Sequence, residues 1–160
     1  NSRLILKNSV SINTRRSKEI LINKFIKEKV DIKKIVIIDT EIKINDHLEC
    51  YNKVDLALDT FPYPGVTTTF ESILMGVPVL TMKGFNFNSR CGESININLG
   101  LNELIADNEN DYVTRALEMQ NNKKKLIEMK KSLIVKVKNS ALFNTKLFAN
   151  DFSHILKNLV

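Results

Sequence analysis

The residues best suited to chemistry lie in one segment, residues 54–80, with the sequence VDLALDTFPYPGVTTTFESILMGVPVL. Its apolar start ends at Asp59, a loop with Pro and Gly follows, and Thr67 and Thr68 open a predicted helix. Gly65 would let a ligand approach the main chain closely, and threonine hydroxyls beside free helix-start amides attract an anion such as a diphosphate. The segment therefore predicts an anion-binding loop.

Two further side chains could complete a nucleotide site. Glu71 lies one turn along the same predicted helix, where its carboxylate would repel phosphate but can accept hydrogen bonds from ribose hydroxyls. His47 opens another predicted helix, where its imidazole could stack on a base. The alternatives are purely structural: the threonines cap a helix, Glu71 favours the helix N-terminus, and His47 lies on the surface.

The elements that must position these residues alternate between strand and helix. Apolar, β-branched runs predict strands at residues 4–6, 35–38, 54–58 and 77–82. Helical periodicity predicts helices at residues 15–29, 46–53, 67–75, 89–99, 111–120, 122–137 and 145–159, and no further strand is clear after Gly84. This alternation predicts an α/β fold, a Rossmann-like parallel sheet with flanking helices, whose ligands bind beyond the carboxyl ends of the strands.

Length and composition favour one globular domain, since the chain has 160 residues, of which 43% are hydrophobic. No apolar run is long enough for a membrane span, and the first residues lack the order of a signal peptide, so we expect a cytoplasmic protein without a membrane partner. Cys50 and Cys91 form no CxxC pair, which argues against a zinc site or a disulfide framework.

The net charge of +6, from 24 basic and 18 acidic residues, suits an anionic ligand such as a nucleotide diphosphate or a nucleic acid. The lysines cluster at residues 123–138, where they alternate with apolar residues at helical spacing. That pattern indicates the solvated face of an amphipathic helix, so we expect no nucleic-acid partner.

Short motifs along nearly the whole chain resemble the O-GlcNAc transferase and SPINDLY family of glycosyltransferases. In chain order they are LDT at 58–60, the Gly and Thr-Thr loop at 65–68, GVP at 76–78, TMKG at 81–84, SR at 89–90, LNELIA at 101–106 and SALFNTK at 140–146. In addition, Glu71 followed by Gly76, Pro78 and Leu80 is similar to the E-x4-G-x-P-x-[LVI] pattern of GT-B glycosyltransferases.

The resemblance implies that residues 1–160 form the C-terminal, nucleotide-sugar-binding lobe of a GT-B enzyme. The donor would be a UDP-sugar or a GDP-sugar, UDP-GlcNAc in most members and GDP-fucose in SPINDLY, and the sugar would pass with inversion to Ser or Thr of acceptor proteins. Such enzymes need no metal, so no cofactor is expected. A first donor-lobe strand, the acceptor lobe that binds those proteins and any tetratricopeptide repeats would lie outside these residues, which would leave the isolated lobe inactive.

The resemblance also implies roles for individual residues. Thr67 and Thr68 match threonines that hold the donor diphosphate, Glu71 stands at the position of an acidic ribose ligand, and His47 matches a base-contacting histidine. The same matches add the remaining donor-binding candidates, which are Asp59, Gly65, Arg90 and, one position from the family's lysine, Lys43 as a phosphate contact. No catalytic residue is identified.

Three positions depart from the animal enzymes. Val66, Pro64 and Glu71 stand where those enzymes have histidine, asparagine and aspartate, so the loop is expected to bind its diphosphate somewhat differently. The alternatives are an O-fucosyl- or N-glucosyltransferase of the same fold, or a non-catalytic lobe that binds nucleotides or serves as a scaffold. An NAD-binding domain is disfavoured because no G-x-G-x-x-G follows the first strand.

Overall fold

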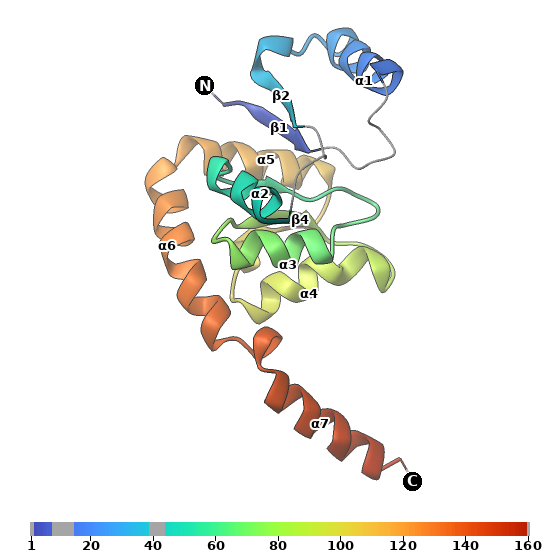
Figure 1. Cartoon of the computed structure of the whole chain (residues 1–160), viewed down its shortest axis with the longest axis vertical. Helices are drawn as coiled ribbons and strands as arrows, with labels where there is room; N and C mark the ends of the chain where they lie inside the picture. Colours follow the sequence, from blue (N-terminus) through green and yellow to red (C-terminus); the bar gives the residue numbers. More distant parts are fainter. Residues whose placement is uncertain (1, 8–14, 39–43, 160) are drawn as a thin grey trace. The chain divides into compact units, whose positions relative to one another are not determined.

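The computed structural model describes residues 2–7, 15–38 and 44–159. The chain divides into two compact units, Asn1–Val54 and Asp55–Val160, and Figure 1 labels the helices and strands of both. Every buried apolar core side chain among the described residues belongs to the second unit. The hydrophobic core of the described residues therefore lies in that unit.

The first unit contains a two-stranded parallel sheet. Strand β1 (Leu4–Lys7) pairs with β2 (Ile35–Ile38), with Leu4 opposite Ile35 and Lys7 opposite Ile38. Helix α1 (Arg15–Lys27) lies between them in the chain, as parallel strands require a crossover. The predicted strands at 4–6 and 35–38 are confirmed.

Helix α1 ends two residues earlier than predicted because its last turn closes as a Schellman motif. Lys29 has a φ of 57° and donates its amide to the Ile26 carbonyl at 2.9 Å, while Val30 donates to the Phe25 carbonyl at 2.9 Å. This left-handed position is usually a glycine, which is why the sequence pattern did not indicate it. Beyond β2, the helix predicted at 46–53 is a short helix, α2 (Ile44–Glu49), followed by a 3-10 turn, η3 (Cys50–Lys53).

The second unit is built on a three-stranded parallel sheet with β4 (Val79–Met82) in the middle. Its neighbours are β3 (Ala57–Leu58) and β5 (Ile105–Ala106). The strand predicted at 54–58 is shorter than expected, and β5 was not predicted at all. A two-residue strand carries no periodicity of its own, and β5 exists because Thr81 and Met82 of β4 pair with it.

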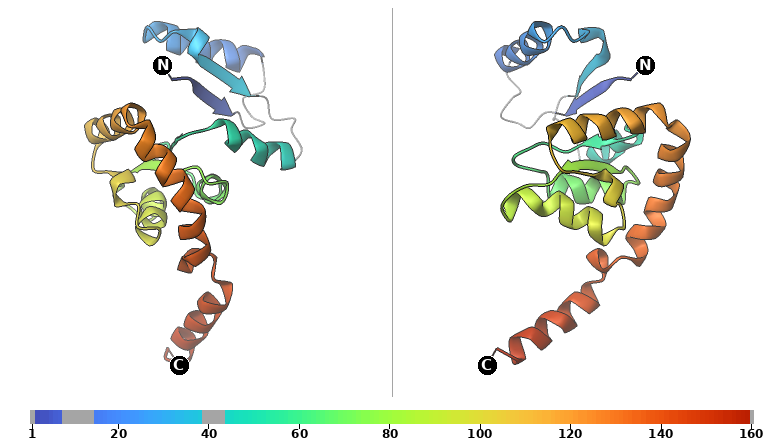
Figure 2. Two further views of the ribbon diagram at one scale, coloured as in Figure 1. Left: turned by 90° about the vertical axis from the view of Figure 1, so that its left-hand side faces the viewer. Right: turned by 180° about the vertical axis from the view of Figure 1, so that it is seen from behind.

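Helices cover both faces of this sheet. Figures 1 and 2 show α5 (Glu109–Asn121) on one side of β4 and α3 (Thr67–Leu74) with α4 (Cys91–Asn98) on the other. The α/β, Rossmann-like fold class is confirmed. The long helix α6 (Lys123–Asn139) packs against α3 and α5, and its buried side chains recur every three or four residues: Leu126, Met129, Leu133 and Val137.

The start of each C-terminal helix is set by an asparagine N-cap. The side chains of Asn108, Asn122 and Asn144 accept the main-chain amides of Asp111, Lys125 and Leu147, each at 3.0 Å. Asparagine is among the preferred residues at this position because its oxygen satisfies an otherwise free amide. The helices predicted at 89–99, 111–120, 122–137 and 145–159 are confirmed, with α4 preceded by a 3-10 turn, η4 (Asn88–Arg90).

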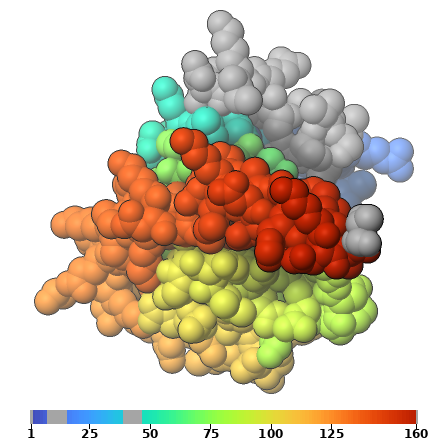
Figure 3. Space-filling view, turned by 90° about the horizontal axis from the view of Figure 1, so that it is seen from below, coloured from blue at the N-terminus to red at the C-terminus, as the bar shows by residue number. Residues whose placement is uncertain are grey.

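After a final 3-10 turn, η6 (Ala141–Phe143), the last helix leaves the body of the unit. Helix α7 (Thr145–Lys157) extends away from the sheet in Figure 1, and in the space-filling view of Figure 3 it lies on the surface. None of its residues is buried. None of the helices within residues 15–38 and 44–159 combines the length and the apolar character that a membrane span requires.

Candidate functional site

The predicted anion-binding loop joins the carboxyl end of β3 to the start of α3. Val66 occupies the N-cap position and makes no side-chain capping bond, so the threonines fall in the first turn. Thr67 and Thr68 are exposed, while Thr69 is buried and donates its hydroxyl to the Gly65 carbonyl at 2.8 Å. The alternative that these threonines cap the helix is therefore wrong, since the N-cap residue is Val66. Two hydroxyl-bearing residues lie instead at an exposed helix start, where main-chain amides lack helical partners.

Gly65 is closely packed in this loop. A Cβ atom at this position would collide with the hydroxyl oxygen of Thr68 and would lie 3.3 Å from that of Thr69. The absence of a side chain thus lets the first turn of α3 fold back against the loop. Whether a ligand also approaches this glycine closely stays a prediction.

Asp59 lies at the base of the same loop and is buried. Its Oδ1 accepts the Gly65 amide at 2.7 Å, and its Oδ2 accepts the Thr81 hydroxyl at 2.9 Å. Burial raises the pKa of Asp59, against the opposing effect of these hydrogen bonds. Glu71, further along α3, is half-buried and already interacts within the chain. A donor-binding role for either carboxylate stays a prediction.

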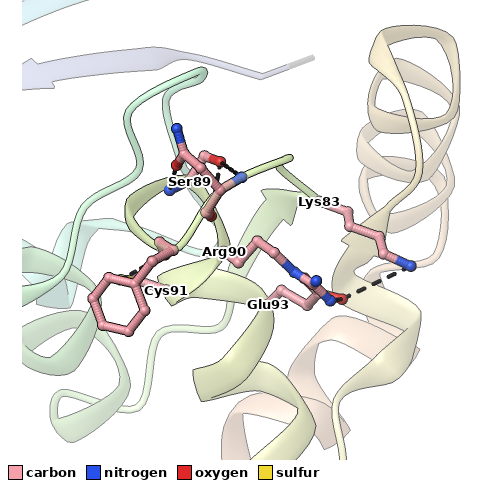
Figure 4. Close-up of polar contacts among 7 residues, drawn as sticks. Lys83, Ser89, Arg90, Cys91 and Glu93 are labelled. Carbon is pink, nitrogen blue, oxygen red and sulfur yellow. Dashed lines mark hydrogen bonds and ion pairs between the residues drawn. The ribbon is translucent and has the colours of Figure 1, made fainter.

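Arg90 forms a tight ion pair at the start of α4, shown in Figure 4. Its Nε and Nη2 donate to the two carboxylate oxygens of Glu93 at 2.6 and 3.1 Å, and the Lys83 ammonium lies 3.9 Å from the same carboxylate. The Arg90 hydrogen bond holds the pKa of Glu93 below its ordinary value, while burial acts in the opposite direction. A contact between Arg90 and the donor stays a prediction, and this guanidinium would have to serve both anions.

A cavity of about 350 Å³ opens between the loops that follow the three strands of the second unit. It is lined by Thr60, Phe61, Pro62 and Pro64 after β3, by Met82, Lys83, Gly84, Phe85 and Ser89 at and after β4, and by Asp107 after β5. Sequence reasoning missed Lys83, Phe85 and Asp107. Lys83 and Phe85 could have been predicted, because they follow a predicted strand at its carboxyl end. Asp107 could not, because it follows strand β5, which was not predicted.

The other two candidates, His47 and Lys43, belong to the first unit. His47 lies in the last turn of α2, not at the start of a helix as predicted. Its ring packs edge-on against the ring of Tyr51, with 5.9 Å between the two ring centroids. Lys43 lies outside the described residues. Among the described residues, no group of three His, Cys, Asp or Glu side chains could hold a metal ion.

Comparison with known proteins identifies the family. The model of the family described as glycosyl transferase family 41 matches residues 13–152. The chain belongs to glycosyl transferase family 41. This confirms the resemblance noted in the motifs of the second unit.

Family 41 relatives align with much of the chain. A probable UDP-N-acetylglucosamine–peptide N-acetylglucosaminyltransferase SPINDLY of Hordeum vulgare is 44% identical over 89 residues, which cover 56% of this chain and 9% of the relative. The protein of the same name from Solanum lycopersicum is 33% identical over 132 residues, covering 82% of this chain and 14% of the relative. The chain therefore spans about a tenth of the length of these proteins.

A solved structure supports the fold as well as the family. An O-GlcNAc transferase of Thermobaculum terrenum matches 98% of this chain with a TM-score of 0.89 and 25% sequence identity, and the match covers 30% of that protein. The predicted fold, the C-terminal half of a GT-B glycosyltransferase, is confirmed by this match.

The Arg90–Glu93 pair makes a prediction about pH. A carboxyl group whose pKa is lowered on folding adds stability that is present above its unfolded pKa and is lost as the pH falls through its folded pKa. We expect Glu93→Gln to flatten the loss of stability that urea unfolding shows as the pH falls below about 5. Glu103→Gln, which removes the exposed pair with Lys125 at 2.8 Å, is the matched control and should change the curve little. Equal curves for wild type and Glu93→Gln would contradict this.

Proposed function

We propose that the chain is the donor-binding lobe of a protein O-glycosyltransferase that uses a nucleotide sugar, with UDP-GlcNAc as the donor. The observation that carries the proposal is the match to family 41 over residues 13–152, which includes the exposed start of α3 beyond the carboxyl end of β3. The names of the SPINDLY relatives, which specify UDP-N-acetylglucosamine as donor and peptides as acceptor, support it.

In this proposal the donor diphosphate lies at the start of α3. Thr67 and Thr68 present hydroxyls there, and the first-turn amides and the helix dipole favour an anion. Glu71 is assigned to the ribose hydroxyls, His47 to the base, and Lys43 and Arg90 to phosphate. The sugar is assigned to the side of the cavity next to Pro64, which lies beside Gly65.

The proposed reaction is an inverting displacement. An acceptor Ser or Thr oxygen attacks the anomeric carbon, the bond from that carbon to the diphosphate oxygen breaks, and the diphosphate leaves with the electron pair. Oriented amides and hydroxyls at α3 would stabilise the negative charge that develops on the leaving group. We propose that no metal cofactor is needed. The hydroxyl proton passes to a base that we do not assign within this lobe.

The proposal also covers acceptor binding and the cell compartment. We assign acceptor binding to parts of the parent protein other than this lobe, including any tetratricopeptide repeats, and we place the protein in the cytoplasm.

Calorimetric titration with UDP, UDP-GlcNAc, GDP-fucose and NAD tests the proposal. We expect UDP and UDP-GlcNAc to bind and NAD not to bind. Glu71→Ala should weaken UDP binding about tenfold, because a carboxylate that accepts ribose hydroxyls contributes about 1.5 kcal/mol or more. Glu118→Ala on α5 removes the same charge far along the chain from the loop and serves as the control.

The titration can also contradict the proposal. Selective binding of GDP-fucose would assign a fucosyl donor in place of UDP-GlcNAc. Binding of UDP that Glu71→Ala leaves unchanged would remove Glu71 from the site, and absence of any nucleotide binding would contradict donor binding by this lobe in isolation.

A further inference from the structure

Asp59 holds the loop before α3 through both of its carboxylate oxygens. The Gly65 amide reaches Oδ1 at 2.7 Å across six residues of chain, and the Thr81 hydroxyl of β4 reaches Oδ2 at 2.9 Å. The carboxylate thus ties the end of the loop to the central strand. The Asp59 side chain is buried, whereas Thr67 and Thr68 are exposed.

Residues of α4 and α5 pack closely around Asp59. A Cβ atom on Gly92 of α4 would lie 2.7 Å from Oδ2 of Asp59 and would collide with the Thr81 hydroxyl, so only glycine leaves room for the pair. From the other side of the sheet, the Tyr112 hydroxyl of α5 donates to the main-chain carbonyl of Asp59 at 2.8 Å. Asp59 is therefore held by elements on both faces of the sheet.

The same network determines where Gly65 lies. Its amide is bound to Asp59 at 2.7 Å, and its carbonyl accepts the Thr69 hydroxyl at 2.8 Å. Both main-chain polar groups of this glycine are thus engaged, directly before the first turn of α3. A buried carboxylate is costly unless it receives hydrogen bonds, so the loop and the carboxylate stabilise each other.

We propose that Asp59 is a positioning residue for the donor diphosphate: it fixes Gly65, and with it the start of α3, without touching the donor. This inference rests on the proposed function, in which the diphosphate binds at Thr67 and Thr68. It replaces direct donor binding as the role of Asp59. A carboxylate in direct contact with the diphosphate would repel it, because both groups are negatively charged. A buried carboxylate that orients main-chain groups strengthens the site without this contact.

The inference predicts that Asp59 matters for the diphosphate and not for the nucleoside. In titrations of the chain followed by nuclear magnetic resonance, Asp59→Asn should weaken UDP binding about tenfold and uridine binding less than twofold. Asparagine keeps the size of the side chain but can accept only one of the two hydrogen bonds. Thr81→Val should act in the same direction, and Thr81→Ser, which keeps the hydroxyl, should bind UDP as the wild type does.

A matched control separates positioning from a general loss of stability. Ser72→Ala removes another buried hydrogen bond of the same lobe, from the Ser72 hydroxyl to the Val77 carbonyl at 3.0 Å, and should leave UDP and uridine binding unchanged. Equal weakening of both ligands by Asp59→Asn, or no weakening of either, would overturn the positioning role.

Amide exchange without ligand tests the hold of Asp59 independently of donor binding. The Gly65 amide should be protected in the wild type and exchange at least about tenfold faster in Asp59→Asn. The Leu101 amide, bound to the Asn96 carbonyl at 2.9 Å in the core, should exchange equally in both. Unprotected Gly65 in the wild type would overturn the inference, whereas protected Gly65 without UDP binding would contradict the proposed function alone.

Discussion

Replacing Thr67 and Thr68 together by valine is expected to weaken UDP binding about 100-fold. Both residues are exposed at the start of α3, and each hydroxyl would donate to a charged diphosphate oxygen. Hydrogen bonds to charged groups contribute about 1.5 kcal/mol or more each, so two lost bonds amount to about 3 kcal/mol. Valine keeps the branched shape, so the helix should remain intact. Calorimetry with UDP measures the effect.

The control for this variant is Thr114→Val on α5. The Thr114 hydroxyl donates to the Asn110 carbonyl at 2.9 Å, on a helix turn outside the loop. We expect this variant to bind UDP as the wild type does. Binding of UDP by the double variant with unchanged affinity would show that the donor diphosphate does not lie at this helix start.

Replacing Gly84 by alanine is expected to lower the free energy of unfolding by about 3 kcal/mol. A Cβ atom there would collide with the side chain and the main-chain carbonyl oxygen of Ser89, and a main-chain atom cannot move aside cheaply. Ser89 also organises this loop: its amide and hydroxyl exchange hydrogen bonds with Asn86 at 2.9 to 3.1 Å. Thermal unfolding and urea titration measure the loss.

Gly100→Ala is the matched control for Gly84→Ala. Gly100 has a φ of 64°, but the nearest atom to an added Cβ is the Lys136 amine at 4.0 Å. Backbone strain without collision should cost only about 1 to 2 kcal/mol. If the two alanine variants lost equal stability, the close approach of Gly84 and Ser89 would not be the reason for a glycine at this position.

Local signals were strong enough to predict most helices and the start of the candidate site. The apolar spacing in residues 122–137 predicted a helix, and its apolar positions match the buried face of α6. The order of strand, loop and threonine-rich helix start also lies within one stretch of chain. Such features depend on residues that are neighbours in the sequence, so they can be predicted without a structure.

Other features depend on partners far along the chain. Strand β5 forms only because it pairs with β4. Asp107 directly follows β5, so it lines the cavity with Lys83 and Phe85 only when this pairing has formed.

The sequence by itself determined the α/β class, the family and the position of the loop between β3 and α3 that is predicted to bind an anion, because periodicity and short motifs carry that information. Only the tertiary structure decided what Asp59 does. Its partners are Gly65, Thr81 and Tyr112, which lie 6, 22 and 53 residues away in the chain. Burial makes these hydrogen bonds necessary, since a carboxylate removed from water must find its hydrogen bonds inside the protein, and through them Asp59 anchors the loop.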